Sequence, residues 1–304
     1  MIVMLSWSKY FQNPTYLELT RKHLISEELR PVILNYCGIH NEAKVLDVGC
    51  GTGYFSRFIA EGNKTAHVVG LEFEQSFIEY AQNEAKEKLL DIAFIQGDAL
   101  HLPFEDESFD AVTSHTFLTS VSDTSKSLKE MMRVCKKGGT ISSITAMSFV
   151  PSIFHNGYYN RECLWVVPLA RLSDKMWRMY EAVNPIKNYM NSTASAEIPH
   201  LFAISGLKEI CAYPIGKLFS LSNALISYEE RVAYLDQTFE SERQKLDTYL
   251  ELKEAREFFS EEDAREYLTL LEQKHNYYKT HPMENEIWEW TGGANVLISG
   301  KRKE

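Results

Sequence analysis

The sequence predicts an α/β protein with a doubly wound, mostly parallel sheet of seven strands, of which the last is antiparallel. Over residues 44–146, short apolar runs that suit buried strands alternate with amphipathic stretches, which is the pattern of βαβ units. The first run leads directly into a glycine-rich turn. Two long stretches, 148–196 and 222–290, break the alternation, and we expect them to form an aromatic and helical lid.

The elements of the first half follow from the spacing of the apolar residues. Residues 1–43 repeat apolar side chains on a roughly helical face, with Pro14 and Pro31 near the expected helix starts. From residue 44 onward the spacing changes to that of a sheet protein. We expect strands at 44–48, 66–71, 92–95, 109–114 and 140–146, and helices at 54–61, 74–90 and 127–134.

The second half returns to the sheet twice. Residues 227–280 are charged and helical, and Ser227 and Ser260 each begin a pattern that resembles a capped helix start. We expect a short helix at 199–205, a long strand at 208–220 interrupted by Pro214 and Gly216, and a last strand at 294–300. The chain then divides into N-terminal helices with the core (1–147), an aromatic insertion (148–196), a completion of the core (197–221), a helical insertion (222–290) and the last strand with a tail (291–304).

Length, charge and cysteine content exclude several classes of protein. The 304 residues allow one large domain or two smaller ones. A formal net charge of −10 is a poor match to a phosphate backbone, so we expect no nucleic-acid partner. No apolar run approaches the ~20 residues of a membrane span, and the brief apolar start lacks the features of a signal peptide. We therefore expect a cytoplasmic protein without a membrane partner. The five cysteines form no C-x-x-C pair, so no metal site is predicted.

The most informative segment runs from Asp47 to Gly53 and reads Asp-Val-Gly-Cys-Gly-Thr-Gly. Alternate glycines let the backbone turn sharply and approach a ligand, while the following helix presents free N–H groups. Tyr54 stands where a P-loop has its lysine and where the dinucleotide fingerprint has its third glycine, so both of those motifs are excluded. The turn either holds a nucleotide or carboxylate or serves only to join a strand to a helix.

Two carboxylates follow the next two strands. Glu72 lies nineteen residues after Gly53, at a strand end that the doubly wound topology places beside the glycine turn. A carboxylate there can accept two hydrogen bonds from a ribose diol; the alternative is a solvated acid in a turn. Asp98 follows the third strand, where a carboxylate can accept a hydrogen bond from an adenine amino group. Its alternative is an aspartate in a polar turn.

The order of these motifs resembles that of the class I S-adenosylmethionine-dependent methyltransferases. It comprises Val-Leu-Asp-Val-Gly-Cys-Gly-Thr-Gly, Val-Val-Gly-Leu-Glu, Gly-Asp-Ala-x-x-Leu-Pro-Phe-x-x-x-x-Phe-Asp and Arg-Val-x-x-x-Gly-Gly. Within this family the chain is similar to the small-molecule branch typified by enzymes of ubiquinone and menaquinone biosynthesis. The resemblance covers residues 40–147, and more faintly 199–220 and 294–303. It implies a Rossmann-like fold and S-adenosylmethionine as the cofactor.

The resemblance also implies a role for each matching position. Asp47, Gly49, Gly51 and Gly53 are expected at the methionine end of the cofactor and Glu72 at the ribose. Phe73 should pack on the adenine, with Asp98 and Ala99 at its edge, and His115 should face the methionine moiety. One departure from the family pattern concerns catalysis. Members often carry Leu-x-His-x-x-Asp after the fourth strand, whereas this chain reads Leu118-Thr-Ser-Val-Ser-Asp123.

The implied reaction is an in-line displacement at the sulfonium methyl group. Positioning and desolvation can supply much of the rate, and a general base is needed only if the acceptor arrives protonated. His115, His155 and Tyr158 are the candidate catalytic residues, with Tyr159 and Glu162 as further possibilities. A histidine at a strand end can equally be structural.

The two unplaced stretches favour a small acceptor. Both connections leave the sheet at the edge where ligands of this fold bind, so we expect them to cover a pocket for a partly apolar or aromatic molecule. Residues 227–280 could instead form a helical appendage or a dimer surface, and we expect a monomer or a homodimer. The competing functions are an RNA or protein methyltransferase and a protein that binds S-adenosylmethionine without catalysis.

Overall fold

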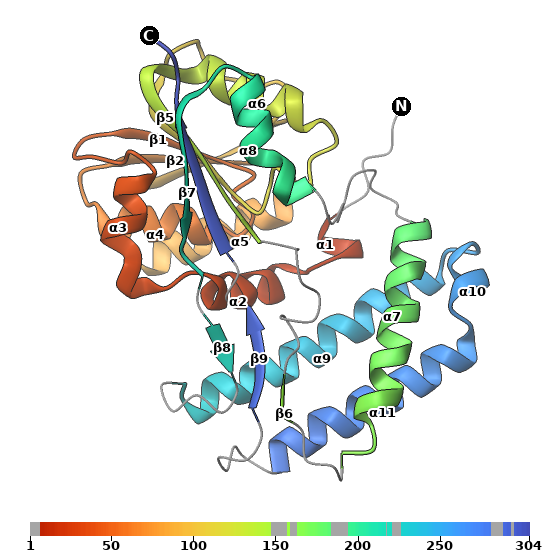
Figure 1. The fold of residues 1–304 in the computed structure, drawn as a ribbon. Helices are drawn as coiled ribbons and strands as arrows, with labels where there is room; N and C mark the ends of the chain where they lie inside the picture. Colours follow the sequence, from red (N-terminus) through yellow and green to blue (C-terminus); the bar gives the residue numbers. More distant parts are fainter. Residues whose placement is uncertain are drawn as a thin grey trace. The chain divides into compact units, whose positions relative to one another are not determined.

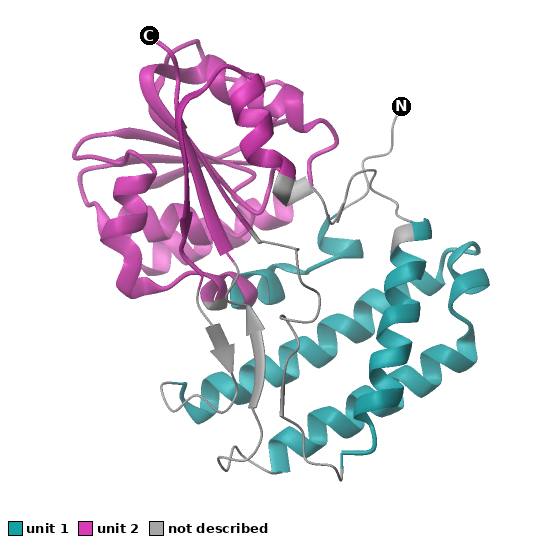
Figure 2. Ribbon diagram, in the orientation of Figure 1, with its two compact units in different colours: residues 1–19, 151–187, 219–291 teal, residues 20–150, 188–218, 292–304 magenta. Residues whose placement is uncertain are grey.

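The computed structural model divides the chain into two compact units (Figure 2). Unit 1 comprises Met1–Leu19, Pro151–Lys187 and Phe219–Thr291, and unit 2 comprises Thr20–Val150, Asn188–Leu218 and Gly292–Glu304. The sequence division placed the N-terminal helices with the core, whereas the structure groups residues 1–19 with unit 1. The described residues are 7–146, 157–158, 163–183, 194–216, 218–220, 226–280, 288–292 and 295–304.

Unit 2 is built on a seven-stranded sheet with the strand order β3-β2-β1-β4-β5-β10-β7 (Figure 1). The first five strands in this order pair in parallel, and β10 runs antiparallel to both β5 and β7. This confirms the predicted fold class. The strands are β1 (Lys44–Val48), β2 (His67–Glu72), β3 (Ile92–Gln96), β4 (Phe109–His115), β5 (Cys135–Ala146), β7 (Lys208–Pro214) and β10 (Asn295–Lys301).

Helices cover both faces of this sheet because successive residues of a strand point to opposite sides. On one face Leu46 packs with residues of α6 (Thr124–Val134) and α8 (Ala194–Ile204). On the other, Val45 packs with residues of α3 (Arg30–Tyr36) and α4 (Tyr54–Gly62). The remaining elements are the 3₁₀ helix η1 (Glu27–Leu29) and α5 (Gln75–Glu87), which contacts β3. The boundary between the two units falls within α2 (Pro14–Leu24).

The strand expected at 208–220 is two strands, and that prediction was wrong in its length. β7 ends at Pro214, which has no N–H to continue a ladder. The chain then gives Ile215 N–H to the carbonyl of Asn295 at 3.0 Å. β8 (Leu218–Ser220) belongs to a separate three-stranded sheet with β6 (Gly157–Tyr158) and β9 (Trp288–Gly292).

Unit 1 is mainly helical. Its helices are α1 (Trp7–Tyr10), α7 (Val166–Val183), α9 (Tyr228–Leu250), α10 (Ala255–Phe258) and α11 (Glu261–Thr280). The predicted cap of α9 is present as a capping box between Ser227 and Glu230. The buried Tyr249 ring lies 4.4 Å from that of Tyr180 and 6.0 Å from that of Tyr10, centroid to centroid. Aromatic packing therefore supplies much of the core of this unit.

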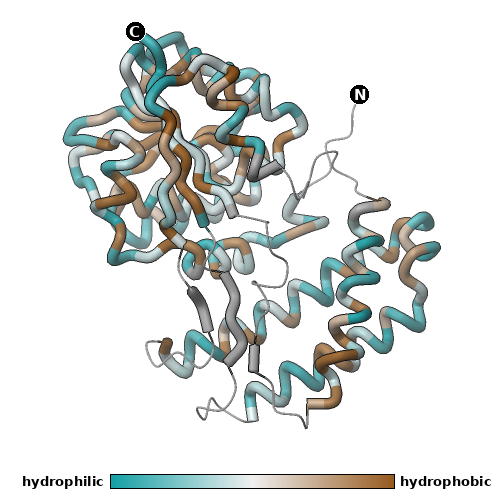
Figure 3. Tube along the Cα trace, in the orientation of Figure 1, coloured by the Kyte–Doolittle hydropathy of each residue, from teal (hydrophilic) through white to brown (hydrophobic). Residues whose placement is uncertain are grey.

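The hydropathy of the chain follows this architecture (Figure 3). The strands of the seven-stranded sheet are largely hydrophobic, whereas the long helices α9 and α11 carry hydrophilic and hydrophobic residues in turn. In the part of the chain that the structure describes, no helix combines the length and the apolar character needed to cross a membrane.

Candidate functional site

The carboxyl ends of β1, β2, β3 and β4 carry most of the residues predicted to act. These strands are neighbours in the sheet, so the loops that follow them lie along one edge. The glycine turn follows β1, Glu72 ends β2, Asp98 follows β3 and His115 ends β4. The structure thus brings the predicted cofactor-binding positions of all four strands to the same edge.

The glycine turn depends on left-handed backbone conformations. The φ angles of Gly49, Gly51 and Gly53 are 67°, 54° and 73°, a region that residues with a Cβ seldom adopt. The turn is fastened to β2, because the N–H groups of Gly49 and Cys50 donate to the carbonyl of Leu71 at 2.8 and 3.0 Å. This geometry turns the chain from β1 into α4 in only five residues.

Two of these glycines are also required by packing within the protein. A Cβ on Gly53 would lie 2.7 Å from the ring of Phe94 and 2.9 Å from the Cβ of Ala81. A Cβ on Gly49 would lie 2.1 Å from the ring of Phe117. Gly53 is buried and begins α4, so its small size serves the packing of α4 against its neighbours. The N–H of Gly51 donates to the carboxylate of Glu72 at 2.9 Å, whereas those of Gly49 and Gly53 donate to backbone carbonyls.

Asp47 is a fully buried carboxyl group at the end of β1. One of its oxygens, Oδ2, accepts a hydrogen bond from the Ser56 hydroxyl of α4 at 2.7 Å. The other, Oδ1, has no hydrogen-bond partner among the described residues. Burial raises the pKa of Asp47 to about 7, and the nearby charge of Glu72 acts in the same direction. A buried carboxylate oxygen without a partner is costly, so Oδ1 is suited to accept a hydrogen bond from a ligand donor such as an ammonium group.

Glu72 holds two ligand-facing loops together. Its Oε2 accepts from Gly51 N–H at 2.9 Å, and its Oε1 accepts from Phe73 and Glu74 N–H at 2.7 and 3.0 Å. Burial raises the pKa of Glu72, although these three N–H groups act in the opposite direction. A carboxylate offers about four acceptor sites, so about one remains, on Oε2, for a ribose hydroxyl. Glu72 therefore orders the site as well as presenting a carboxylate to it.

Phe73 presents an apolar ring at the same edge. Its residue is 46% exposed, which is high for a phenylalanine in a protein of this size. Its backbone is fixed from two sides, since its N–H donates to Glu72 and its carbonyl accepts from Gln96 Nε2 at 3.0 Å. A planar ring held by a rigid backbone at a strand end is suited to stacking on a flat aromatic ligand.

Asp98 and Ala99 follow β3. Asp98 Oδ1 accepts from Leu100 N–H at 2.8 Å, and Oδ2 lies 3.2 Å from His101 Nδ1. The Asp98 side chain is 38% exposed, whereas Ala99 is buried in the core cluster beneath α6. The carboxylate is thus held in one orientation and still open to a ligand.

His115 ends β4 in a buried setting. Its ring lies 5.8 Å from that of Phe55, and its Nε2 has no hydrogen-bond partner among the described residues. Burial lowers the pKa of His115 well below its usual value, with the charge of Arg21 acting in the same direction, so the ring is neutral at physiological pH. The next residue, Thr116, has a φ of 51°, a strained conformation for a β-branched side chain, and its hydroxyl donates to the His115 carbonyl at 2.8 Å.

Two further catalytic candidates cannot be placed. His155 lies outside the described residues, as do Tyr159 and Glu162. Tyr158 is described only by its backbone, in β6. Within the described ranges, no group of three or more His, Cys, Asp or Glu side chains is arranged to hold a metal ion.

The residues at this edge fit S-adenosylmethionine. The unpartnered Oδ1 of Asp47 suits the cofactor's ammonium group, and the exposed ring of Phe73 suits its adenine. The left-handed glycines let the chain turn sharply at the end of β1, beside both of these groups. The fit thus rests on an acceptor, an aromatic surface and a sharp turn at neighbouring strand ends.

Comparison with known proteins supports the resemblance seen in the sequence. The profile of a family described as "Methyltransferase domain" matches residues 39–184, just under half of the chain. The demethylmenaquinone methyltransferase of Staphylococcus carnosus is 28% identical over 208 residues, which are 66% of this chain and 85% of that protein. By these similarities the chain is a methyltransferase that resembles the class I, S-adenosylmethionine-dependent enzymes. Its cofactor is S-adenosylmethionine, and the resemblance seen in the sequence is confirmed.

Other relatives of this methyltransferase agree. The demethylmenaquinone methyltransferase of Staphylococcus aureus (strain JH9) is 32% identical over 155 residues, 49% of this chain and 64% of that protein. In this alignment the methyltransferase spans less than two thirds of its relative. The fold is shared with phosphoethanolamine N-methyltransferase 2 of Haemonchus contortus, solved in complex with S-adenosyl-L-methionine. The TM-score is 0.53 at 16% identity, over 99% of this chain and 61% of that one.

Sequence reasoning missed four residues that shape the site. Arg57 is buried and donates to the carbonyl of Thr52 in the glycine turn at 2.6 Å. Phe117 packs on Gly49, and Glu130 and Arg133 of α6 hold the segment after β3. The one available signal was an arginine in the first turns of the helix that follows the glycines. The other contacts join residues far apart in the sequence, which local patterns do not reveal.

Proposed function

We propose that this methyltransferase transfers the methyl group of S-adenosylmethionine to a small, partly apolar or aromatic molecule. The observation that supports the cofactor half of this proposal is the buried Oδ1 of Asp47, which has no partner among the described residues and lies beside a left-handed glycine turn. The acceptor class is supported by the relatives, which are named for demethylmenaquinone. The aromatic content of the chain, 12% of its residues, is in keeping with such an acceptor.

Each residue at the edge has a distinct task in this proposal. Asp47 accepts from the ammonium of the methionine end, Glu72 from a ribose hydroxyl and Asp98 from the adenine amino group. Phe73 stacks on the adenine with Ala99 at its edge, and the sharp turn of Gly49, Gly51 and Gly53 brings the backbone after β1 to the methionine end of the ligand. The bound cofactor supplies an activated methyl group. The chain's contribution is to orient that group and to exclude water from it.

The base, if the acceptor needs one, has one described candidate. The neutral imidazole of His115 can accept a proton, and it ends β4 next to the strained Thr116. Its lowered pKa makes it a weak base that is always in the accepting form near neutral pH. His155 and Tyr158 remain candidates from the sequence.

The test is methyl transfer from S-[methyl-³H]adenosylmethionine to a panel of acceptors. The panel contains reduced short-chain naphthoquinones and benzoquinones, bulk tRNA and a mixed-protein extract. We expect label in the quinol fraction and none above background in RNA or protein. Label only in RNA or protein would replace the small-molecule proposal, and tight cofactor binding without any transfer would indicate a binding protein.

A further inference from the structure

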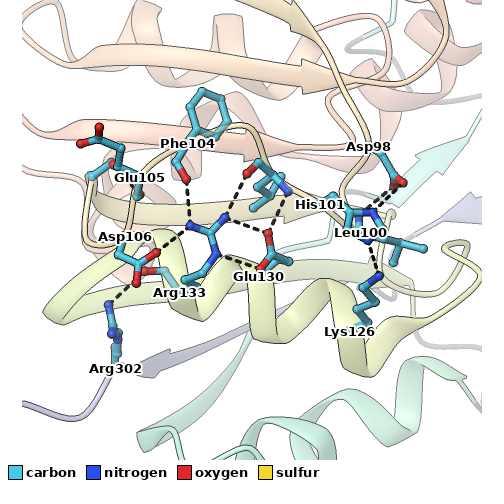
Figure 4. A network of polar contacts seen from close by, with 12 residues as sticks. Asp98, Leu100, His101, Phe104, Glu105, Asp106, Lys126, Glu130, Arg133 and Arg302 are labelled. Atoms are coloured by element: carbon cyan, nitrogen blue, oxygen red, sulfur yellow. Dashed lines mark hydrogen bonds and ion pairs between the residues drawn. The ribbon is translucent and has the colours of Figure 1, made fainter.

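The segment that follows β3 is irregular yet tightly fixed. Residues 97–108 contain no helix or strand, and they carry both residues assigned to the adenine edge, Asp98 and Ala99. An irregular backbone must find hydrogen-bond partners outside itself. Figure 4 shows that Glu130 and Arg133 of α6 bind this backbone and that Lys126, on the same face of α6, contacts the side chain of His101. Their spacing of four and then three residues places them on the same side of a helix.

Arg133 is the centre of this arrangement. Its guanidinium uses all five of its N–H donors in five hydrogen bonds. They run to both Glu130 oxygens (2.8 Å each), to the carbonyls of Leu102 (2.9 Å) and Phe104 (2.8 Å), and to Asp106 Oδ1 (2.8 Å). Glu130 Oε2 also accepts from Leu102 N–H at 2.9 Å. The backbone of Leu102 is thereby held on both its donor and its acceptor.

Lys126 holds the beginning of the same segment. Its ammonium lies 2.6 Å from His101 Nε2, and His101 Nδ1 lies 3.2 Å from Asp98 Oδ2. An ammonium can only donate, so Nε2 accepts and the ring proton resides on Nδ1, which donates to Asp98. Lys126 therefore orients the Asp98 carboxylate through His101 (Figure 4).

The charges of the Glu130–Arg133 pair reinforce this arrangement. Hydrogen bonds to Arg133 lower the pKa of Glu130, and those to Glu130 and Asp106 raise the pKa of Arg133. The two side chains are only 20% and 31% exposed, so the pair is better shielded than an ordinary surface ion pair. A bidentate pair with three further acceptors also imposes one geometry.

We propose that this face of α6 is a positioning device that gives the enzyme its selectivity for the adenine amino group. Glu130 and Arg133 fix the backbone from Leu102 to Asp106, Lys126 fixes His101, and together they hold the Asp98 carboxylate at the angle that accepts from the amino group. The inference rests on the proposed role of Asp98. The three residues act through Asp98 and touch neither cofactor nor acceptor.

The experiment compares two ligands that differ at one position of the base. S-Inosylhomocysteine carries a carbonyl oxygen where S-adenosylhomocysteine carries the amino group. Calorimetry gives the dissociation constant of each, and their ratio measures amino-group selectivity. The wild-type protein should prefer the adenosine compound by about tenfold or more, the effect of one hydrogen bond to a charged acceptor. Asp98→Asn should reduce the ratio to about threefold or less.

Arg133→Met is the main variant, and Arg133→Lys and Glu130→Gln are milder versions. We expect each of these variants to lower the ratio of the two dissociation constants toward the value for Asp98→Asn. The double variant Asp98→Asn/Arg133→Met should have the same ratio as Asp98→Asn alone. Arg243→Met is the matched control. Arg243 makes the same two-pronged pair with Glu240 three residues away, at 3.0 and 2.7 Å, on α9 in unit 1. Its ratio should equal the wild type's.

A purely structural role predicts a different pattern. If Arg133 only stabilises the fold, both ligands will weaken equally, the ratio will stay at the wild-type value, and the proposal is wrong. If Arg133→Met does not fold, Arg133→Lys and Glu130→Gln decide the matter.

Two outcomes concern the wild type. If it binds both ligands equally well, Asp98 does not recognise the amino group, which overturns the proposed role of Asp98 and this inference with it. Absence of binding of either ligand would instead contradict the proposed cofactor site.

Discussion

At the scale of single residues, the site combines groups whose ordinary chemistry has been altered by burial. Asp47 is an acid with a pKa of about 7, and His115 is an imidazole that stays neutral. Both carry a buried atom without a partner among the described residues. Perturbed pKa values cluster at functional sites, and both groups lie at the carboxyl edge of the parallel sheet, where ligands of this fold bind.

Asp47 gives a prediction about protons. Its pKa rises from 3.8 to about 7 on folding, so its ionisation costs stability as the pH increases between these values. An ammonium group bound at Oδ1 favours the ionised form. We therefore expect cofactor binding at pH 6 to release close to one proton, and cofactor affinity to increase as the pH rises through about 7. Calorimetry in buffers of different ionisation enthalpy measures this release. The same release in Asp47→Asn would assign the proton to another group.

Glu72 gives a prediction that separates its direct contact with the ribose from its role in ordering the neighbouring backbone. Glu72→Ala should weaken S-adenosylhomocysteine at least about tenfold, because a charge-assisted hydrogen bond to the ribose is lost. The structure shows that Glu72 also orders Gly51 and Phe73 N–H, so part of this loss is indirect. The 2′-deoxy analogue distinguishes the two effects. The wild type should favour the hydroxylated ligand, and Glu72→Ala should not. An unchanged preference in the variant would place the ribose elsewhere.

At the scale of elements, the sequence located the strands of the core to within one or two residues at most ends, because each is a short apolar run beside a turn. β5 begins at Cys135, five residues before its predicted start. The helix α7 was not predicted, since the bulky aromatics of that stretch obscured its period. The packing that excludes a side chain at Gly53 could not be predicted from the sequence either, because its neighbours Phe94 and Ala81 are forty-one and twenty-eight residues away. Local patterns predict elements, whereas the fixing of loops by side chains depends on the fold.

The cap of α9 gives a prediction at this scale. Ser227→Ala removes the hydroxyl that accepts from Glu230 N–H at 3.2 Å, so we expect a loss of about 1 kcal/mol in the free energy of unfolding of the helical unit. Thr248→Ala, in the interior of the same helix, is the control and should cost little, since its exposed hydroxyl only donates to the carbonyl of Gln244. Urea denaturation followed by helical circular dichroism measures both. Equal losses in the two variants would mean that the cap contributes nothing specific.

At the scale of the whole molecule, the main open prediction is that the inserted stretches cover the substrate. The described part of these stretches consists mainly of α7, α9 and α11. If they act as a lid, their backbone amides should be less protected without ligands than with both ligands bound.

Hydrogen exchange tests this on the full chain. We expect slower exchange in α7, α9 and α11 when S-adenosylhomocysteine and an acceptor are added together, and the sheet strands β1 and β2 should respond to S-adenosylhomocysteine alone. If the exchange rates of the helices are the same with and without both ligands, while those of the strands change, the helical unit is an appendage or an assembly surface.

The position of β10 has a consequence for how the protein is made. This strand, residues 295–301, lies between β5 and β7 and pairs with both. Until the ribosome has delivered it, β5 and β7 each present an open edge with unpaired backbone groups, which invites association between nascent chains. The nascent sheet thus stays unfinished through the synthesis of nearly the whole helical unit, and its closure joins residues some 150 positions apart, which is intrinsically slow. The sheet therefore remains open to such association until the strand between β5 and β7 has been made.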